Sequence, residues 1–159
     1  MTRKTSPDAQ PSAGDAMAAA FAEARAAGAR GEVPIGAAVV DPAGRVIAAA
    51  GNRVEGLGDP SAHAELLALR AAAAALGQAR LTDCDLYVTL EPCPMCAAAI
   101  ALFRIRRLYF AAYDPKGGGV EHGPRIFDQP TCNHRPERYG GIRESDAAAL
   151  LQDFFKARR

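Results

Sequence analysis

Residues 89–96, TLEPCPMC, constrain the local fold more than any other part of the chain. Proline restricts the residue before it to extended conformations, and it is tolerated in the first turn of a helix, where its missing N–H would have no partner. Pro92 and Pro94 therefore predict an abrupt change from strand to helix at Cys93. On that helix Cys93 and Cys96 share one face, and the unpaired N–H groups of the first turn favour their thiolate forms.

A Cys-x-x-Cys pair is compatible with a redox couple, a structural metal site or part of a catalytic metal site. A closed structural zinc site needs four ligands, whereas a catalytic one usually has three and keeps a position for water. The sequence has no second Cys-x-x-Cys and no His-x-x-x-His, which favours an open site. The other possible ligands of these types are single residues: His63, His122, His134, Cys84 and Cys132.

A second motif, His63-Ala-Glu65, follows Asp59-Pro-Ser61 at a predicted helix start. Residues two apart on a helix point to nearly opposite sides, so His63 and Glu65 are poorly placed to bind one ion together. A carboxylate close to a metal but not bound to it is suited to proton transfer. The motif therefore favours catalytic chemistry over a purely structural site.

Strands and helices alternate along most of the chain. Residues 35–41 and 45–50 predict a β-hairpin, residues 85–89 and 107–112 predict further strands, and 52–60 predicts a loop. Helices are expected at 15–29, 63–75, 93–103 and 144–157, and the glycine-rich segment 114–141 is expected to be irregular. The last helix carries an apolar stripe that should pack on the core, with Phe154 or Phe155 part of it. The pattern indicates an α/β layered domain with a mixed sheet.

Length and composition predict one domain over residues 15–159, preceded by a flexible tail at 1–14. No apolar run approaches the roughly 20 residues of a membrane span, and the N-terminal segment lacks the apolar core of a signal peptide, so a cytoplasmic location without membrane contact is expected. Residues 101–159 contain 11 lysines and arginines against 7 acidic residues, whereas residues 1–100 contain 8 against 11. This asymmetry permits a polyanionic ligand near the C-terminal elements, although a solvated helix would look similar.

Together, His63-Ala-Glu65 and Pro92-Cys93-Pro-Met-Cys96 resemble the His-x-Glu and Pro-Cys-x-x-Cys signature of zinc-dependent nucleoside deaminases. From about residue 16 to the end, the chain further resembles the bacterial tRNA-specific adenosine deaminases, which make inosine at the anticodon wobble position. The segments that carry this closer likeness are residues 32–36 (EVPIG), 51–53 (GNR), 59–65 (DPSAHAE), 86–93 (LYVTLEPC), 133–135 (NHR) and 153–155 (DFF).

The resemblance implies a cytidine deaminase-like three-layer α/β/α sandwich with a central mixed five-stranded sheet, assembled as a homodimer. It implies one Zn²⁺ per subunit held by His63, Cys93 and Cys96, with Glu65 moving protons during hydrolytic deamination of adenosine to inosine. The implied partner is the anticodon stem-loop of a tRNA, with tRNA-Arg as the expected one.

The resemblance also implies substrate contacts. Asn52 would hydrogen-bond the flipped base, and Val33 and Pro34 would line its pocket. Asp114 would contact sugar of the anticodon loop, and Lys116 would lie near phosphate together with the basic C-terminal end.

Two other functions are compatible with the same residues. One is deamination of free purine or triazine bases, such as guanine, on the same fold. The other is a non-catalytic zinc-stabilised domain that binds RNA or a protein, which would not need Glu65. Cys84 is expected to be a buried apolar residue, whereas Cys132, His122 and His134 receive no assigned role.

Overall fold

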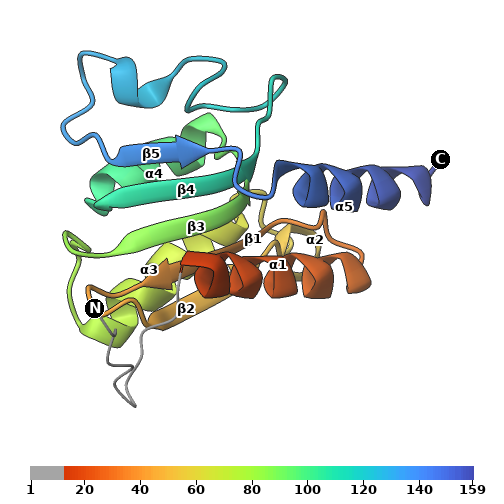
Figure 1. Ribbon diagram of the computed structural model, residues 1–159, viewed down its shortest axis with the longest axis horizontal. Helices are drawn as coiled ribbons and strands as arrows, with labels where there is room; N and C mark the ends of the chain where they lie inside the picture. Colours follow the sequence, from red (N-terminus) through yellow and green to blue (C-terminus); the bar gives the residue numbers. More distant parts are fainter. Residues whose placement is uncertain (1–12) are drawn as a thin grey trace, which may run out of the picture.

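The computed structural model describes residues 13–159 and has a five-stranded mixed sheet between two layers of helices (Figure 1). The strand order is β2-β1-β3-β4-β5. The strands are β1 (Gly36–Val40), β2 (Val46–Gly51), β3 (Asp85–Leu90), β4 (Arg107–Ala112) and β5 (Glu137–Gly140). Helices α1 (Ala13–Ala29) and α5 (Glu144–Lys156) lie on one face, and α3 (Ala64–Leu76) and α4 (Pro94–Leu102) on the other. The expected three-layer α/β/α sandwich is confirmed.

Alternation of apolar side chains along each strand produces the two layers, because successive residues point to opposite faces of a sheet. In β1, Val39 packs with α3 and α4, whereas Ala38 packs with α1. The same alternation places Leu86 in β3 under α3 and α4 and Tyr87 under α1. All five residues of β1 are buried, so this strand lies at the centre of the core.

The connections bring several chain segments to one edge of the sheet. Strand β3 is parallel to β4, and α4 is the crossover between them, as expected. Strand β1 is antiparallel to both β2 and β3, so β2 and β3 run in the same direction and α3 connects them. Both crossover helices therefore begin after strands that end at the same edge of the sheet, which is where a site can form between them.

The close contact between α1 and the sheet requires glycine at residue 36. A Cβ atom added to Gly36 would lie 1.9 Å from the carbonyl oxygen of Ala20 and 2.6 Å from the nitrogen of Ala24. No side chain can be accommodated there without moving the helix. This contact fixes the start of β1, and with it residues 32–35 at the edge of the site.

Three expectations from the sequence were incomplete or wrong. The predicted loop at 52–60 contains the short helix α2 (Val54–Leu57), and the irregular segment 114–141 contains the 3-10 helix η1 (Ile126–Asp128) and strand β5. The expectation that Phe154 or Phe155 packs in the core was wrong: α5 extends beyond the sheet (Figure 1), and among its residues only Ala147 is buried. Phe155 is 48% exposed.

Residues 1–12 of the expected flexible tail lie outside the described part, and α1 begins at Ala13, two residues earlier than predicted. Within residues 13–159, no helix combines the length and apolar content needed to cross a membrane.

Candidate active site

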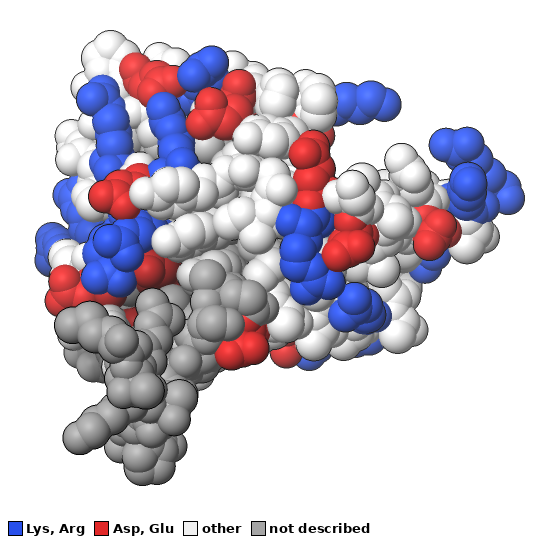
Figure 2. Space-filling view, viewed as in Figure 1, with Lys and Arg blue, Asp and Glu red and all other residues white. Residues whose placement is uncertain are grey.

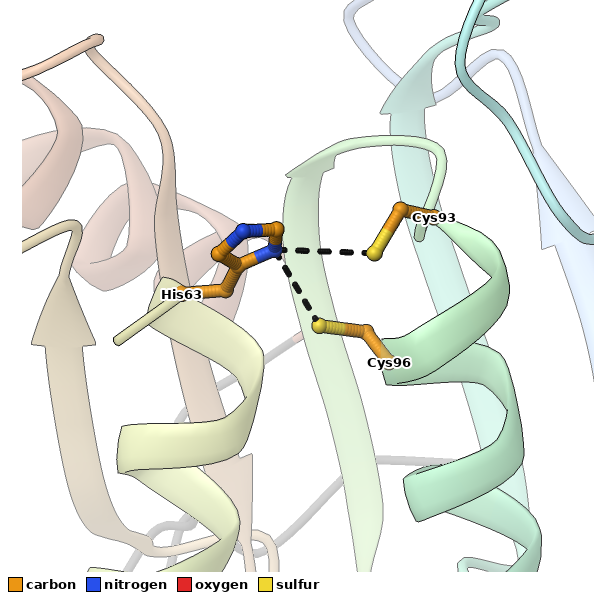
Figure 3. Close-up of side chains that lie close together, drawn as sticks. All are labelled: His63, Cys93 and Cys96. Carbon is orange, nitrogen blue, oxygen red and sulfur yellow. Dashed lines mark hydrogen bonds between the residues drawn. The ribbon is translucent and has the colours of Figure 1, made fainter. Parts of the chain in front are cut away.

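The candidate site lies where the N-termini of α3 and α4 approach each other (Figure 3). His63 is the N-cap residue of α3 and Cys93 the N-cap residue of α4, and both have extended backbone angles. Pro94 occupies the first turn of α4, and Cys96 follows in the same turn. The strand-to-helix change predicted from the prolines is therefore confirmed. The backbone N–H of Cys96, in the first turn of α4, hydrogen-bonds to the sulfur of Cys93.

Three donor atoms converge at this point. The Sγ atoms of Cys93 and Cys96 lie 3.5 and 3.6 Å from Nδ1 of His63, and all three atoms are within 4.8 Å of one another. A tetrahedral zinc ion at about 2.3 Å from sulfur and about 2.1 Å from nitrogen would separate the two atoms by about 3.6 Å. The donor set therefore fits zinc in both chemistry and spacing. Within residues 13–159 it is the one cluster of its kind.

Charge is shared unequally among the three donors. A hydrogen bond from Cys96 lowers the pKa of Cys93 to about 4, against the opposing effect of burial and with a further contribution from His63. The same hydrogen bond raises the pKa of Cys96, and Cys93 also raises the pKa of His63. The backbone of Pro60 hydrogen-bonds to the His63 ring and helps to orient it. These shifts favour the thiolate at Cys93, and a bound cation would replace the protons on the neighbouring donors.

Glu65 lies in the first turn of α3 and is 4% exposed. Burial raises the pKa of its carboxyl group, Cys93 raises it further, and His63 lowers it. Its side chain also hydrogen-bonds to Cys96, although it is not one of the three clustered donors. The position agrees with the prediction that His63 and Glu65 do not bind one ion side by side. A buried carboxyl group with a raised pKa next to such a cluster is suited to proton transfer.

A cavity of about 500 Å³ opens beside His63. Of the predicted substrate residues, Val33 and Asn52 line it, whereas Pro34 lines an adjacent surface hollow. Phe154 borders both spaces, a placement that was not expected from the sequence, which favoured core packing for Phe154 or Phe155. The other residues around the cavity are Gly31, Glu32, Ile35, Val54 and Glu55.

Asn52 connects the cavity wall at Val33 to the start of α3, beside His63. Its Oδ1 accepts the N–H of Ala64 at 2.9 Å, and its Nδ2 donates to the carbonyl of Val33 at 3.2 Å. The first of these bonds satisfies a free N–H at the start of α3, beside His63. The second leaves one Nδ2 hydrogen available, because a carboxamide nitrogen carries two.

Asp114 and Lys116 belong to the loop after β4 and do not line the cavity. Oδ1 of Asp114 accepts the N–H groups of Lys116 and Gly117 at 3.2 and 3.0 Å, so this carboxylate stabilises its own turn. The Lys116 side chain is exposed. Asn52 and Val33 thus line the same cavity as His63, whereas Asp114 and Lys116 lie on a separate surface loop.

The remaining cysteines and histidines have structural partners. Cys84 is buried as expected, and burial raises the pKa of its thiol. Cys132 donates to the carbonyl of His134 at 3.1 Å, and Nε2 of His134 lies 2.6 Å from the carbonyl oxygen of Ile105. Nδ1 of His122 lies 2.8 Å from Oε1 of Glu91.

Glu91 was missed by the sequence analysis, although it directly precedes Pro92-Cys93. Its side chain has no solvent-exposed surface. Burial acts to raise its pKa, but hydrogen bonds from His122 and from backbone N–H groups hold the pKa below its ordinary value. The sequence signal available was an acidic residue directly before Pro92-Cys93, whereas its burial and its partners depend on a distant loop.

Comparison with known proteins gives a consistent result. Residues 11–112 match the cytidine and deoxycytidylate deaminase zinc-binding region, whose cofactor is zinc. The tRNA-specific adenosine deaminase of Agrobacterium fabrum is 59% identical over 143 residues, covering 90% of this chain and 93% of that protein.

Solved structures extend the comparison. One comes from studies of A-to-I editing by tRNA:A34 deaminases at the wobble position of transfer RNA; it is 60% identical, has a TM-score of 0.84, and the match covers 86% of this chain and 98% of that one. A guanine deaminase from Nitrosomonas europaea is 27% identical with a TM-score of 0.72, and the match covers 94% of this chain and 84% of that one. The chain therefore belongs to the tRNA-specific adenosine deaminases, with the zinc-binding region of the cytidine and deoxycytidylate deaminases.

Proposed function

We propose that the protein is a zinc-dependent hydrolase that converts adenosine to inosine at the wobble position of a tRNA anticodon and releases ammonia. The observation that carries the proposal is the cluster of His63, Cys93 and Cys96, in which His63 also lines a cavity of about 500 Å³, together with the buried carboxyl group of Glu65. An open metal site next to a cavity, with a carboxyl group that does not join the donors, is the arrangement that hydrolytic deamination requires. The relatives described above favour adenosine in tRNA as the substrate.

In this proposal His63, Cys93 and Cys96 hold the ion, which when bound supplies Lewis acidity toward water. Glu65 accepts a proton from the water molecule that attacks C6 of adenine and delivers it to N1. Glu65 then takes the proton of the new hydroxyl group on C6 and delivers it to the amino group; the C6–N6 bond breaks, C6 becomes a carbonyl, and water and adenosine have given inosine and ammonia. One carboxyl group acts first as base and then as acid.

The cavity wall would select and orient the base. Val33 supplies apolar surface in the cavity, Pro34 supplies it in the adjacent hollow, and the second Nδ2 hydrogen of Asn52 is available to an acceptor on the purine. Because the same Asn52 side chain caps α3 at Ala64, a base held by Asn52 is positioned relative to His63. The base would therefore be oriented by a directional hydrogen bond as well as by apolar contacts.

The RNA outside the cavity would meet charged and loop residues. Asp114 and Lys116 are proposed to contact the anticodon loop, and the basic end of α5 to lie near phosphate. Figure 2 shows basic side chains gathered at the end of α5, where the sequence has Lys156, Arg158 and Arg159. Elsewhere on the face in Figure 2, acidic and basic side chains are mixed, so electrostatic attraction to RNA should be local.

The substrate proposal is tested by measuring ammonia and inosine from four substrates: a tRNA-Arg anticodon stem-loop with adenosine at position 34, a different stem-loop with adenosine there, free adenosine and free guanine. The tRNA-Arg stem-loop should be deaminated with a kcat/KM roughly 100-fold above both free compounds, because several contacts outside the cavity are lost with them. Equal rates on the two stem-loops would contradict the tRNA-Arg assignment. Faster release from guanine would replace the proposal with free-base deamination.

We also propose a homodimer, supported by the composition of α4. Its sequence, PMCAAAIAL, is apolar all round, which is typical of a helix covered on every side. However, Met95 is 39% exposed and Leu102 is 73% exposed. A second copy covering this surface would remove both side chains from water. Sedimentation velocity should therefore give the mass of a dimer, Leu102→Lys should shift it toward the monomer, and a monomeric wild-type protein would contradict the assignment.

The proposed location is the cytoplasm, which holds tRNA and keeps cysteine thiols reduced. Recovery of the protein in a membrane or secreted fraction would count against it.

A further inference from the structure

Glu91 is a buried carboxylate with an unusually complete set of donors. Oε1 accepts the N–H of Asp114 at 3.1 Å and lies 2.8 Å from Nδ1 of His122. Oε2 accepts the N–H groups of Val120, Glu121 and His122 at 3.2, 3.0 and 3.1 Å. A carboxylate offers about four lone-pair sites, so five donors saturate it.

These donors come from the two ends of one loop. Asp114 lies just after β4, and residues 120–122 lie where the chain returns toward α4, so a single side chain ties both ends of residues 114–122 together. Four of the five donors are backbone N–H groups, which can reach one carboxylate only if the loop adopts this conformation. The loop's shape therefore depends on Glu91.

The loop is also pressed against the strand-to-helix turn that carries Cys93. The N–H of Gly119 donates to the carbonyl of Pro92 at 2.8 Å. A Cβ on Gly119 would lie 2.6 Å from Cα of Pro94, and a Cβ on Gly118 would lie 2.3 Å from Oε2 of Glu91. Only glycine allows the loop backbone to approach residues 91–94 this closely, at the Glu91 carboxylate and at the backbone of Pro94.

His122 contacts the buried Glu91 carboxylate from its solvent-facing side. Its side chain is 35% exposed, and its ring meets the edge of Tyr113 at 6.0 Å between centroids. The bond from Nδ1 to Glu91 fixes the ring orientation and satisfies a carboxylate oxygen that has no access to water.

We propose that Glu91 is a positioning residue, which with His122 holds loop 114–122 in a fixed place relative to Cys93. The inference rests on the proposed function, because this loop carries Asp114 and Lys116, the proposed contacts to the anticodon loop. Glu91 and Cys93 are only two residues apart. One short segment therefore carries both a donor of the proposed zinc site and the side chain that holds loop 114–122. The RNA contacts are built before the substrate arrives, which lowers the entropic cost of binding.

The experiment compares Glu91→Gln, His122→Phe and the control Glu137→Gln, an exposed carboxylate on β5 that pairs with Arg107. Glutamine keeps the shape of the side chain but directs an amide NH₂ at N–H donors, and phenylalanine keeps the ring but removes its donor. With the tRNA-Arg stem-loop, KM should rise by roughly 30-fold for Glu91→Gln and about 5-fold for His122→Phe, the order expected from hydrogen bonds to a charged group. The kcat and zinc content should stay near wild type, and the control should be unchanged.

An unchanged KM, a fall in kcat alone, or loss of zinc from Glu91→Gln would overturn the proposal. If that variant does not fold, the KM of His122→Phe decides. Hydrogen exchange at the amides of residues 120–122 provides a test that needs no activity. Exchange should be faster in Glu91→Gln and in His122→Phe than in the wild type. Unchanged protection of these amides would overturn the proposal. A wild-type protein inactive on the stem-loop would refute the proposed function, while the exchange result would still decide whether Glu91 holds the loop.

Discussion

Replacing Glu65 with glutamine is expected to lower kcat for deamination by roughly 10³-fold to 10⁴-fold while the zinc content stays at one ion per chain. The physical reason is that the amide of glutamine fills the same buried space beside Cys96 but cannot accept and return a proton. Single-turnover measurement of inosine at saturating enzyme isolates the chemical step, and elemental analysis gives the zinc content.

The matched control is Glu137→Gln, which makes the same chemical change on an exposed side chain paired with Arg107. It should retain wild-type kcat. If Glu65→Gln keeps a kcat within about tenfold of wild type, Glu65 does not move the proton and the catalytic assignment is wrong. If zinc is lost from Glu65→Gln, the carboxyl group supports the metal cluster, and the kinetic result says nothing about proton transfer.

Replacing Cys96 with alanine is expected to remove zinc, abolish activity and lower the unfolding temperature together. Its Sγ lies 3.6 Å from Nδ1 of His63, and the residue is fully buried, so no solvent molecule can readily take its place. Elemental analysis should give less than about one tenth of an ion per chain, since two donors hold zinc far more weakly than three.

The matched control for this prediction is Cys84→Ala, which removes a buried thiol outside the cluster. It should keep full zinc content and lose only about 1 kcal/mol of unfolding free energy. In the wild type, a chelator should abolish activity and added zinc should restore it. Zinc retained at one ion per chain in Cys96→Ala would exclude Cys96 as a ligand.

The sequence predicted those parts of the fold and site that depend on neighbouring residues. Pro92 and Pro94 fix the backbone around Cys93 whatever lies elsewhere, and α4 begins within one residue of the predicted place. The helices expected to begin at residues 63 and 93 begin one residue later, so that His63 and Cys93 are N-cap residues instead of first-turn residues. The convergence of His63 with the cysteines depends on strand order and was available only through the resemblance to known deaminases.

Features that depend on distant segments were not predictable from the residues alone. Strand β5 has the sequence ERYG, with no alternation of apolar residues, and it forms because β4 offers it an unpaired parallel edge. Phe154 has the spacing of a core residue, yet α5 extends past the sheet and carries that ring to the cavity. The bonds of Glu91 join it to residues 23 to 31 positions later, a distance over which local sequence patterns carry no information.

Because the proposed zinc donors come from two helices, zinc binding is thermodynamically linked to folding. His63 and Cys93 are 30 residues apart in the chain and belong to different helices, so an ion bound to both acts as a cross-link that the unfolded chain cannot form. The folded state then gains free energy with the logarithm of the free zinc concentration above the dissociation constant. Stability of this protein is therefore a property of its solution as well as of its sequence, and unfolding temperatures can be compared only at a stated zinc activity.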